Sequence, residues 1–314
     1  MVSGQRLWGW WTQGKLDMLR DYLHAFTVAA SKKAPTTTYL DLFAGGPENL
    51  DRDTREPVPS SAQIALETSP PFTDLRFFEL EGAAELEVAL RAQFPDRAFT
   101  VTPGDSNTTV GEVLGAGDLS PRAPVFAFID PNGPDCWWTT LETLAGFKRG
   151  VSKYKVELWM LFPEGMMTRL LPRTGDPRPE VSDRITRVFG TDEWQRIYRA
   201  RVEGCLEPDE ARFEYVNLMR WRLEHELGYT WTHAFAVRNS KRPLYSMVFA
   251  TDNSAGHKIM GETYAKFAAE FPEMAEEARR RRQSQGTLFA TPTDSAPYEH
   301  TKALPPYGSP SRRP

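Results

Sequence analysis

Four acidic residues in this sequence stand at the ends of short apolar runs, where they could do chemistry. They are Asp41, Glu79, Asp105 and Asp130. Ligands of open α/β sheets bind beyond the carboxyl ends of the strands, at the point where the strand order reverses. If the apolar runs are strands of one sheet, the four carboxylates lie around a single ligand site.

The first run, residues 39–43, is apolar apart from Asp41 and leads into a glycine turn. Small residues in such a turn let the backbone approach a ligand closely, and Asp41 can accept hydrogen bonds from a ligand's amine. The alternative is an ordinary strand-to-helix turn without a ligand. The turn residues that we assign to the candidate cofactor site are Phe43, Ala44, Gly45 and Gly46.

The second and third runs each end near a further carboxylate. Glu79 can accept hydrogen bonds from both ribose hydroxyls, as the acidic residue of dinucleotide-binding folds does, although Glu81 is a competing candidate and a solvated glutamate before a helix is the alternative. Asp105 can accept a hydrogen bond from an adenine amino group, or it can be the N-cap of a helix. The neighbours assigned to the same cofactor site are Leu80, Gly104 and Ser106.

The fourth run, VFAFI at residues 125–129, is followed by Asp130, Pro131, Asn132 and Gly133. Proline stops the preceding residue from continuing as helix, so a carboxylate is held at the mouth of a pocket. It could align an acceptor's lone pair and handle one proton. We therefore assign Asp130 and Asn132 as candidate catalytic residues, and Asp130 and Pro131 also to the cofactor site. The alternative is a simple Pro-Asn-Gly turn.

The elements that must position these residues follow from the hydrophobic period. Leu16, Leu19, Leu23, Phe26 and Ala30 recur at helical spacing, so a helix precedes the first strand. Strands alternating with helices predict a doubly wound, seven-stranded, mostly parallel sheet, and the last two strands are close enough for an antiparallel hairpin. The expected strands span residues 39–43, 75–80, 98–102, 125–129, 156–162, 231–237 and 244–251, and the expected helices between them span 61–67, 83–93, 139–147, 181–189 and 210–227.

Composition limits the function classes. The net charge of −4 divides into +5 from residue 279 onward and −9 before it, and an acidic body is a poor non-specific binder of nucleic acid. The tail, rich in proline and serine after about Gln283, is predicted to be disordered. Two distant cysteines indicate neither disulfides nor zinc, the five histidines form no metal-binding pattern, and no segment reaches membrane-spanning length. We expect a cytoplasmic protein.

Taken together, the motifs resemble those of class I S-adenosylmethionine-dependent methyltransferases. Over residues 8–261 they resemble the three-Cys-motif partner proteins (TcmP), a family of presumed methyltransferases. The resemblance implies a Rossmann-like methyltransferase domain at 39–278 with an insertion near 164–230, between a Trp-rich segment and helix at 1–38 and a tail at 279–314. The motifs that carry it are Trp11 with Lys15, DLFAG at 41–45, Ser61 opening AQIAL, Gly104-Asp105-Ser-Asn107, Asp130-Pro131 with Gly133, Phe189-Gly190 then Trp194, and YSMVFATDNSAGHKI at 245–259.

The resemblance implies S-adenosyl-L-methionine as cofactor, with Lys15 also in the cofactor site, and no resident metal. It supplies no substrate. Asn132 stands where an aromatic residue would more typically stack on a flat acceptor, and Gly46-Pro47 replaces the usual Pro-Gly of the turn. We expect N-methylation of a small molecule or peptide. The alternatives are an RNA or DNA base methyltransferase and a non-catalytic partner protein, in either case with a three-Cys-motif protein as a possible partner.

Overall fold

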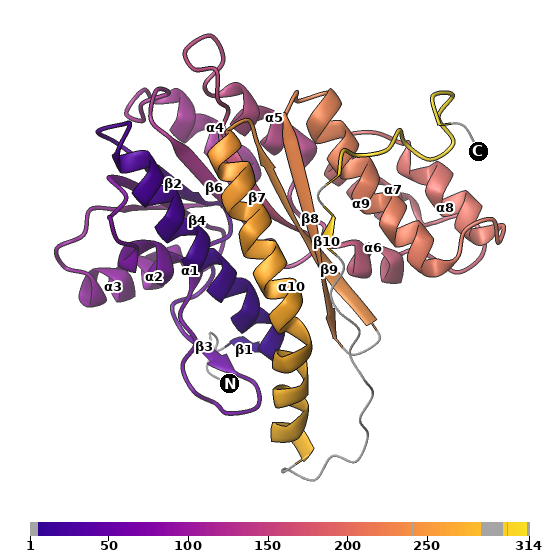
Figure 1. Cartoon of the computed structure of the whole chain (residues 1–314), viewed down its shortest axis with the longest axis horizontal. Coiled ribbons are helices and arrows are strands. Elements are labelled where there is room, and N and C mark those ends of the chain that lie inside the picture. The colour runs from indigo at the N-terminus through magenta and orange to yellow at the C-terminus, as the bar shows by residue number, and fades with distance from the viewer. Residues whose placement is uncertain (1–5, 240–241, 284–297, 300, 313–314) are drawn as a thin grey trace.

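A mixed sheet runs through the centre of the computed structural model, which describes residues 6–239, 242–283, 298–299 and 301–312 (Figure 1). The strands occur in the order β10-β8-β9-β7-β6-β2-β4-β5. The bounds are β2 (Thr38–Asp41), β4 (Asp74–Glu79), β5 (Thr100–Pro103), β6 (Val125–Ile129), β7 (Glu157–Phe162), β8 (Trp231–Asn239), β9 (Arg242–Thr251) and the two-residue β10 (Tyr298–Glu299).

The predicted fold class is confirmed, and all seven predicted strands are present. From β2 the chain adds β4 and β5 on one side and then β6 and β7 on the other, with every pair parallel. The hairpin of β8 and β9 completes the sheet, and β9 pairs antiparallel with β7. The strand order therefore reverses between β2 and β6, so the crevice beyond these two strands is the expected ligand site.

Helices cover both faces of the sheet, which is why its parallel strands read as continuous apolar runs. In β6 all five residues are buried. Val125, Ala127 and Ile129 belong to one hydrophobic cluster, while Phe126 and Phe128 belong to the other. The helices are α1 (Trp10–Ser31), α2 (Ser61–Glu67), α3 (Ala83–Gln93) and α10 (Ser254–Gln283) on the phenylalanine side, and α4 (Ser106–Gly115), α5 (Trp138–Gly146), α6 (Glu164–Leu170), α7 (Pro179–Phe189), α8 (Trp194–Val202) and α9 (Pro208–His225) on the other.

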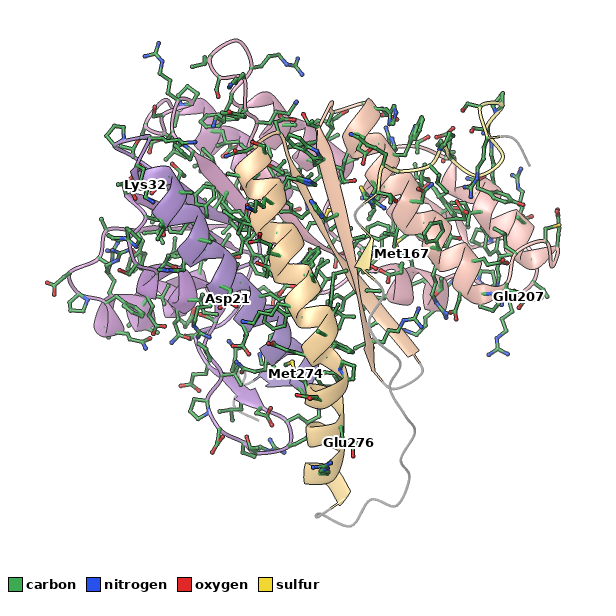
Figure 2. The ribbon with its side chains drawn as sticks, viewed as in Figure 1. Asp21, Lys32, Met167, Glu207, Met274 and Glu276 are labelled. Carbon is green, nitrogen blue, oxygen red and sulfur yellow. The ribbon has the colours of Figure 1, made fainter. Side chains whose placement is uncertain are left out.

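Helices α1 and α10 lie side by side across one face, although they are more than 200 residues apart in the chain (Figure 1). Lys266 of α10 pairs with Asp21 of α1 at 2.7 Å. A Cβ atom added to Gly14 of α1 would lie 3.1 Å from Met274 of α10, and Figure 2 labels both Asp21 and Met274. This close contact holds the N-terminal part of α1, which carries Lys15, against the domain.

Helices α4, α6, α8 and α10 were not predicted. The first three are short, so they offer few turns over which a helical period can be recognised. A parallel ribbon of β1 (Arg6–Trp8) and β3 (Asn49–Asp51) was also missed, and it is secured by a hydrogen bond from Trp8 Nε1 to Asn49 Oδ1 of 2.7 Å. Within the described residues, no helix is both long and apolar enough to cross a membrane.

The described part of the C-terminal tail differs from the predicted disorder. Residues 301–312 pack against α9, where the Asn217 amide donates to Leu304 O at 3.0 Å and accepts from Leu304 N at 2.8 Å. Arg312 forms a bidentate ion pair with the buried Glu214. The low hydrophobicity of the tail did not predict this packing, because the contacts are hydrogen bonds and an ion pair rather than apolar contacts. Residues 284–297, which the same prediction covered, lie outside the described residues.

Candidate functional site

A cavity of about 730 Å³ lies beyond the carboxyl ends of β2, β4, β5 and β6, where the strand order reverses. We call it the switch-point cavity. Its volume is that of a site for a small-molecule ligand. Its walls include Leu42, Phe43, Phe78, Glu79, Leu80, Glu81, Gly104, Asp105, Ser106, Asn107, Asp130, Asn132, Pro134, Asp135, Trp137, Glu180, Asp183, Arg184 and Arg187.

Glu79 is held at the end of β4 by two backbone donors. Gly45 N donates to its Oε2 at 2.6 Å, and Glu81 N donates to its Oε1 at 3.2 Å. Gly45 has a φ of +74°, a conformation that favours glycine. A carboxylate has about four lone-pair sites, so both oxygens can still accept from a ligand's hydroxyls. Glu81 lines the cavity as well but is exposed.

Asp105 is the N-cap of α4, as one of the two interpretations predicted. Its Oδ1 accepts hydrogen bonds from the Asn107 backbone and side chain, each at 2.9 Å. It also lines the cavity, so contact with an adenine amino group stays a prediction. The next residue, Ser106, is 3% exposed, and its Oγ has no hydrogen-bond partner among the described residues. A cavity wall with an unsatisfied hydroxyl is suited to a polar ligand.

Asn107 has a positioning role that sequence reasoning missed. Its amide nitrogen donates to Asp135 O at 2.8 Å, while Oδ1 accepts from Trp137 N at 2.9 Å and from Thr140 Oγ1 at 2.8 Å. These bonds fix the loop after β6 to the start of α4. The only sequence signal was that Asn107 belongs to the motif that begins at Gly104.

Asp130 forms an ion pair with Lys15 of α1. The Lys15 side chain is 3% exposed, whereas that of Asp130 is 17% exposed and reaches the switch-point cavity. The Lys15 ammonium also lies 5.8 Å from the ring centre of Trp8 and 5.9 Å from that of Tyr245. Lys15 was assigned to the cofactor site, but the contact that the structure gives it is with the candidate catalytic carboxylate.

Asp41 is completely buried and lines neither the switch-point cavity nor the smaller one beside it. Burial raises its pKa to about 7. A hydrogen bond from Ser61 opposes this shift and the charge of Asp130 adds to it. Tyr39 Oη also donates to Asp41 at 3.2 Å. The structure therefore places Asp41 behind the wall of the site, whereas the prediction had it contacting the ligand's amine.

Ala44 and Gly45 line a smaller cavity of about 30 Å³, which shares Phe43, Asp130 and Asn132 with the first, while Gly104 lines the switch-point cavity. Gly46 and Pro131 line neither cavity. Leu80 is 66% exposed at the rim of the switch-point cavity. The residues of the smaller cavity are Trp8, Thr12, Lys15, Leu16, Phe43, Ala44, Gly45, Asn49, Pro59, Ser60, Ser61, Asp130 and Asn132.

Helix α7 closes the cavity with side chains that were not predicted. Arg184 pairs with Asp135 at 2.5 Å, and the Arg187 guanidinium lies 5.4 Å from the ring centre of Trp137. Glu180, in the first turn of α7, also lines the cavity. Counting all walls, seven carboxylates face two arginines, so the cavity favours a ligand with net positive charge.

Two of the described histidines lie close together away from the switch-point cavity. His233 and His257 approach each other at 2.8 Å, and His257 lies against Trp231 with the ring centres 4.9 Å apart. Neither residue is part of the switch-point cavity. Among the residues that the structure describes, no group of three or more histidine, cysteine or acidic side chains could hold a metal ion.

No family model and no curated protein matches the chain. The solved structures similar to this chain include that of protein LPL1258 from Legionella pneumophila str. Philadelphia 1, described with the family model DUF519. The two structures align over 92% of this chain and 97% of the Legionella chain, with 12% sequence identity and a TM-score of 0.46.

Proposed function

We propose that this protein is an S-adenosylmethionine-dependent methyltransferase that methylates a nitrogen atom of a small-molecule or peptide acceptor. The observation that carries the proposal is the net-acidic cavity at the switch point, with Glu79 after β4 and Asp130 after β6. The resemblance to the three-Cys-motif partner proteins supports it from the sequence. At neutral pH the cofactor has a sulfonium, an ammonium and one carboxylate, so its net positive charge matches this cavity.

The residues present fit the cofactor. Glu79 would accept from the ribose hydroxyls, since both of its oxygens keep free lone pairs. Ser106 Oγ, buried and unsatisfied, would gain a hydrogen-bond partner from a polar ligand. The exposed Leu80 at the rim would cover a flat base.

When bound, S-adenosylmethionine supplies an electrophilic methyl group, so the chain's own task is chiefly alignment. Lys15 donates to Asp130 Oδ2, which leaves Oδ1 to accept an N–H group of the acceptor. That hydrogen bond would direct the nitrogen lone pair into the cavity, and the Asp130 carboxylate could accept the proton that the nitrogen releases. Asn132 is exposed beside it, where its amide can orient an acceptor but cannot take up a proton.

Titration calorimetry with S-adenosylmethionine tests the proposal. Glu79→Ala should weaken binding about 10- to 100-fold, because it removes charge-assisted hydrogen bonds. The matched control is Glu112→Ala, which removes an exposed carboxylate on α4 outside the cavity and should leave affinity unchanged. Absence of binding to the wild-type protein would contradict the proposal and favour a non-catalytic partner protein. If S-adenosylmethionine binding is weakened in Glu81→Ala but not in Glu79→Ala, the ribose contact belongs to Glu81 instead of Glu79.

A further inference from the structure

A second cavity, of about 760 Å³, lies within the insertion between α6, α8, α9 and the loop after α6. We call it the arginine cavity. Figure 2 labels Met167 on α6 and Glu207 at the start of α9. The walls of the arginine cavity include Gly165, Thr168, Arg169, Leu171, Pro172, Arg173, Tyr198, Arg201, Val202, Pro208, Ala211, Arg212 and Tyr215.

All the charged side chains in these walls are arginines. In the described part of the chain, no ion pair joins Arg169, Arg173 or Arg201 to a carboxylate, while Arg212 pairs with Asp209 at 2.5 Å. About three positive charges around one cavity therefore have no carboxylate partner, that of the half-buried Arg201 and those of the exposed Arg169 and Arg173. Like charges held together repel each other, so an anion bound among them would reduce that repulsion.

Contacts within the insertion hold the walls of the arginine cavity in place. The single hydroxyl proton of Tyr198 is shared between Gly175 O, at 2.6 Å, and Pro172 O, at 3.2 Å, which ties the loop after α6 to α8. Tyr215 is only 1% exposed. Arg201 and Arg212 are half-buried, so less side-chain freedom is lost when they bind.

We propose that the arginine cavity binds a small ligand that carries two linked phosphate groups. The planar guanidinium matches phosphate oxygens with paired donors. Two linked phosphates carry about three negative charges at neutral pH, equal to the unpaired positive charge of the cavity. A concave site of this volume suits a compact ligand, whereas the backbone of a nucleic-acid strand is recognised by an extended basic groove.

Calorimetric titration of the full chain with inorganic pyrophosphate tests this without S-adenosylmethionine or an acceptor, so its failure is distinct from failure of the proposed function. The wild-type protein should bind at one site. Arg201→Gln should weaken binding about 10-fold, and Arg201→Lys should weaken it less, because the charge stays and the paired donors are lost. Arg199→Gln removes the same charge from α8 outside the cavity and should have no effect.

Unchanged melting temperatures would show that the variants are folded. The proposal is overturned if wild-type protein does not bind pyrophosphate at millimolar concentration, or if Arg201→Gln and Arg199→Gln bind it equally. A single-stranded oligonucleotide provides the second arm of the experiment. If it binds through Arg201 while pyrophosphate does not, the site serves a nucleic-acid backbone and the proposal is wrong.

Discussion

The switch-point cavity lies beyond the carboxyl ends of parallel strands, whereas the arginine cavity lies among α6, α8 and α9, and the charges of the two cavities are opposite. Seven carboxylates and two arginines line the first, and four arginines without a carboxylate line the second. The strand order decides where the acidic residues after the strands converge, whereas the packing of three helices brings the arginines together. A net charge of −4 for the whole chain conceals this separation.

The largest effect that would test the acidic side of this comparison is expected at Asp130. Asp130→Ala should lower the methyl-transfer rate at least about 100-fold, because the acceptor loses both its alignment and its proton acceptor. Cofactor affinity should change little. Asn132→Ala is the matched variant and should be milder. Single-turnover transfer, measured beside calorimetric affinity once an acceptor is known, gives both values.

Two outcomes at Asp130 would change the assignment. If Asp130→Ala transfers methyl groups at the wild-type rate, the segment after β6 is a structural turn without a catalytic role. Loss of cofactor binding would move Asp130 from the acceptor side of the cavity to the cofactor side. Because Asp130 pairs with the buried Lys15, a melting curve is needed to show that the variant remains folded.

Removal of residues 298–314 should affect the two cavities unequally. Glu214 on α9 would lose its ion pair with Arg312, and Asn217 would lose its two hydrogen bonds with Leu304, so the melting temperature should fall. Helix α9 also carries Arg212 and Tyr215 of the arginine cavity, so pyrophosphate binding should weaken while S-adenosylmethionine binding does not. Calorimetry and thermal unfolding test this, with Arg312→Gln as the variant that removes only the ion pair. An unchanged melting temperature would show that the docked segment contributes no stability.

The smallest expected effect is a difference in how the ligand affinities of the two cavities depend on salt concentration. Raising sodium chloride from about 50 to 300 mM shortens the range of charge interactions. Pyrophosphate affinity should therefore fall about 10-fold, because several full charges meet at the arginine cavity. S-adenosylmethionine affinity should change by less than about threefold, since hydrogen bonds and apolar contacts share in its binding. Equal salt dependence at both sites would contradict the contrast in charge.

The strands and most residues of the switch-point cavity could be predicted from the sequence, because each strand and the residue at its end are encoded in a short stretch of sequence. A run such as VFAFI followed by Asp130 specifies a buried strand and the residue at its end. The position of Asp41 was less predictable. In β2 the side chains alternate between the two faces, and Asp41 turned toward the buried hydroxyls of Tyr39 and Ser61 rather than toward the cavity.

The arginine cavity and the Lys15 ion pair could not be predicted in the same way. Arg169, Arg173, Arg201 and Arg212 stand at irregular spacings on different elements, so no period brings them together. Lys15 and Asp130 are 115 residues apart. Contacts between distant segments depend on how the helices pack over the sheet, and that packing is set by the whole core.

The last prediction concerns Glu164, which is 2% exposed at the start of α6, next to the arginine cavity. Burial raises its pKa to about 7, and a hydrogen bond from Ser246 and the charge of Arg212 oppose the shift. Since the folded pKa exceeds the ordinary value of 4.5, its stabilising contribution is complete below about pH 4.5 and is lost as the pH rises through about 7. The loss is at most about 1.4 kcal/mol per pH unit. Denaturant unfolding between pH 5 and 8 should therefore show Glu164→Gln gaining stability relative to wild type as the pH rises, and parallel curves would contradict the assignment.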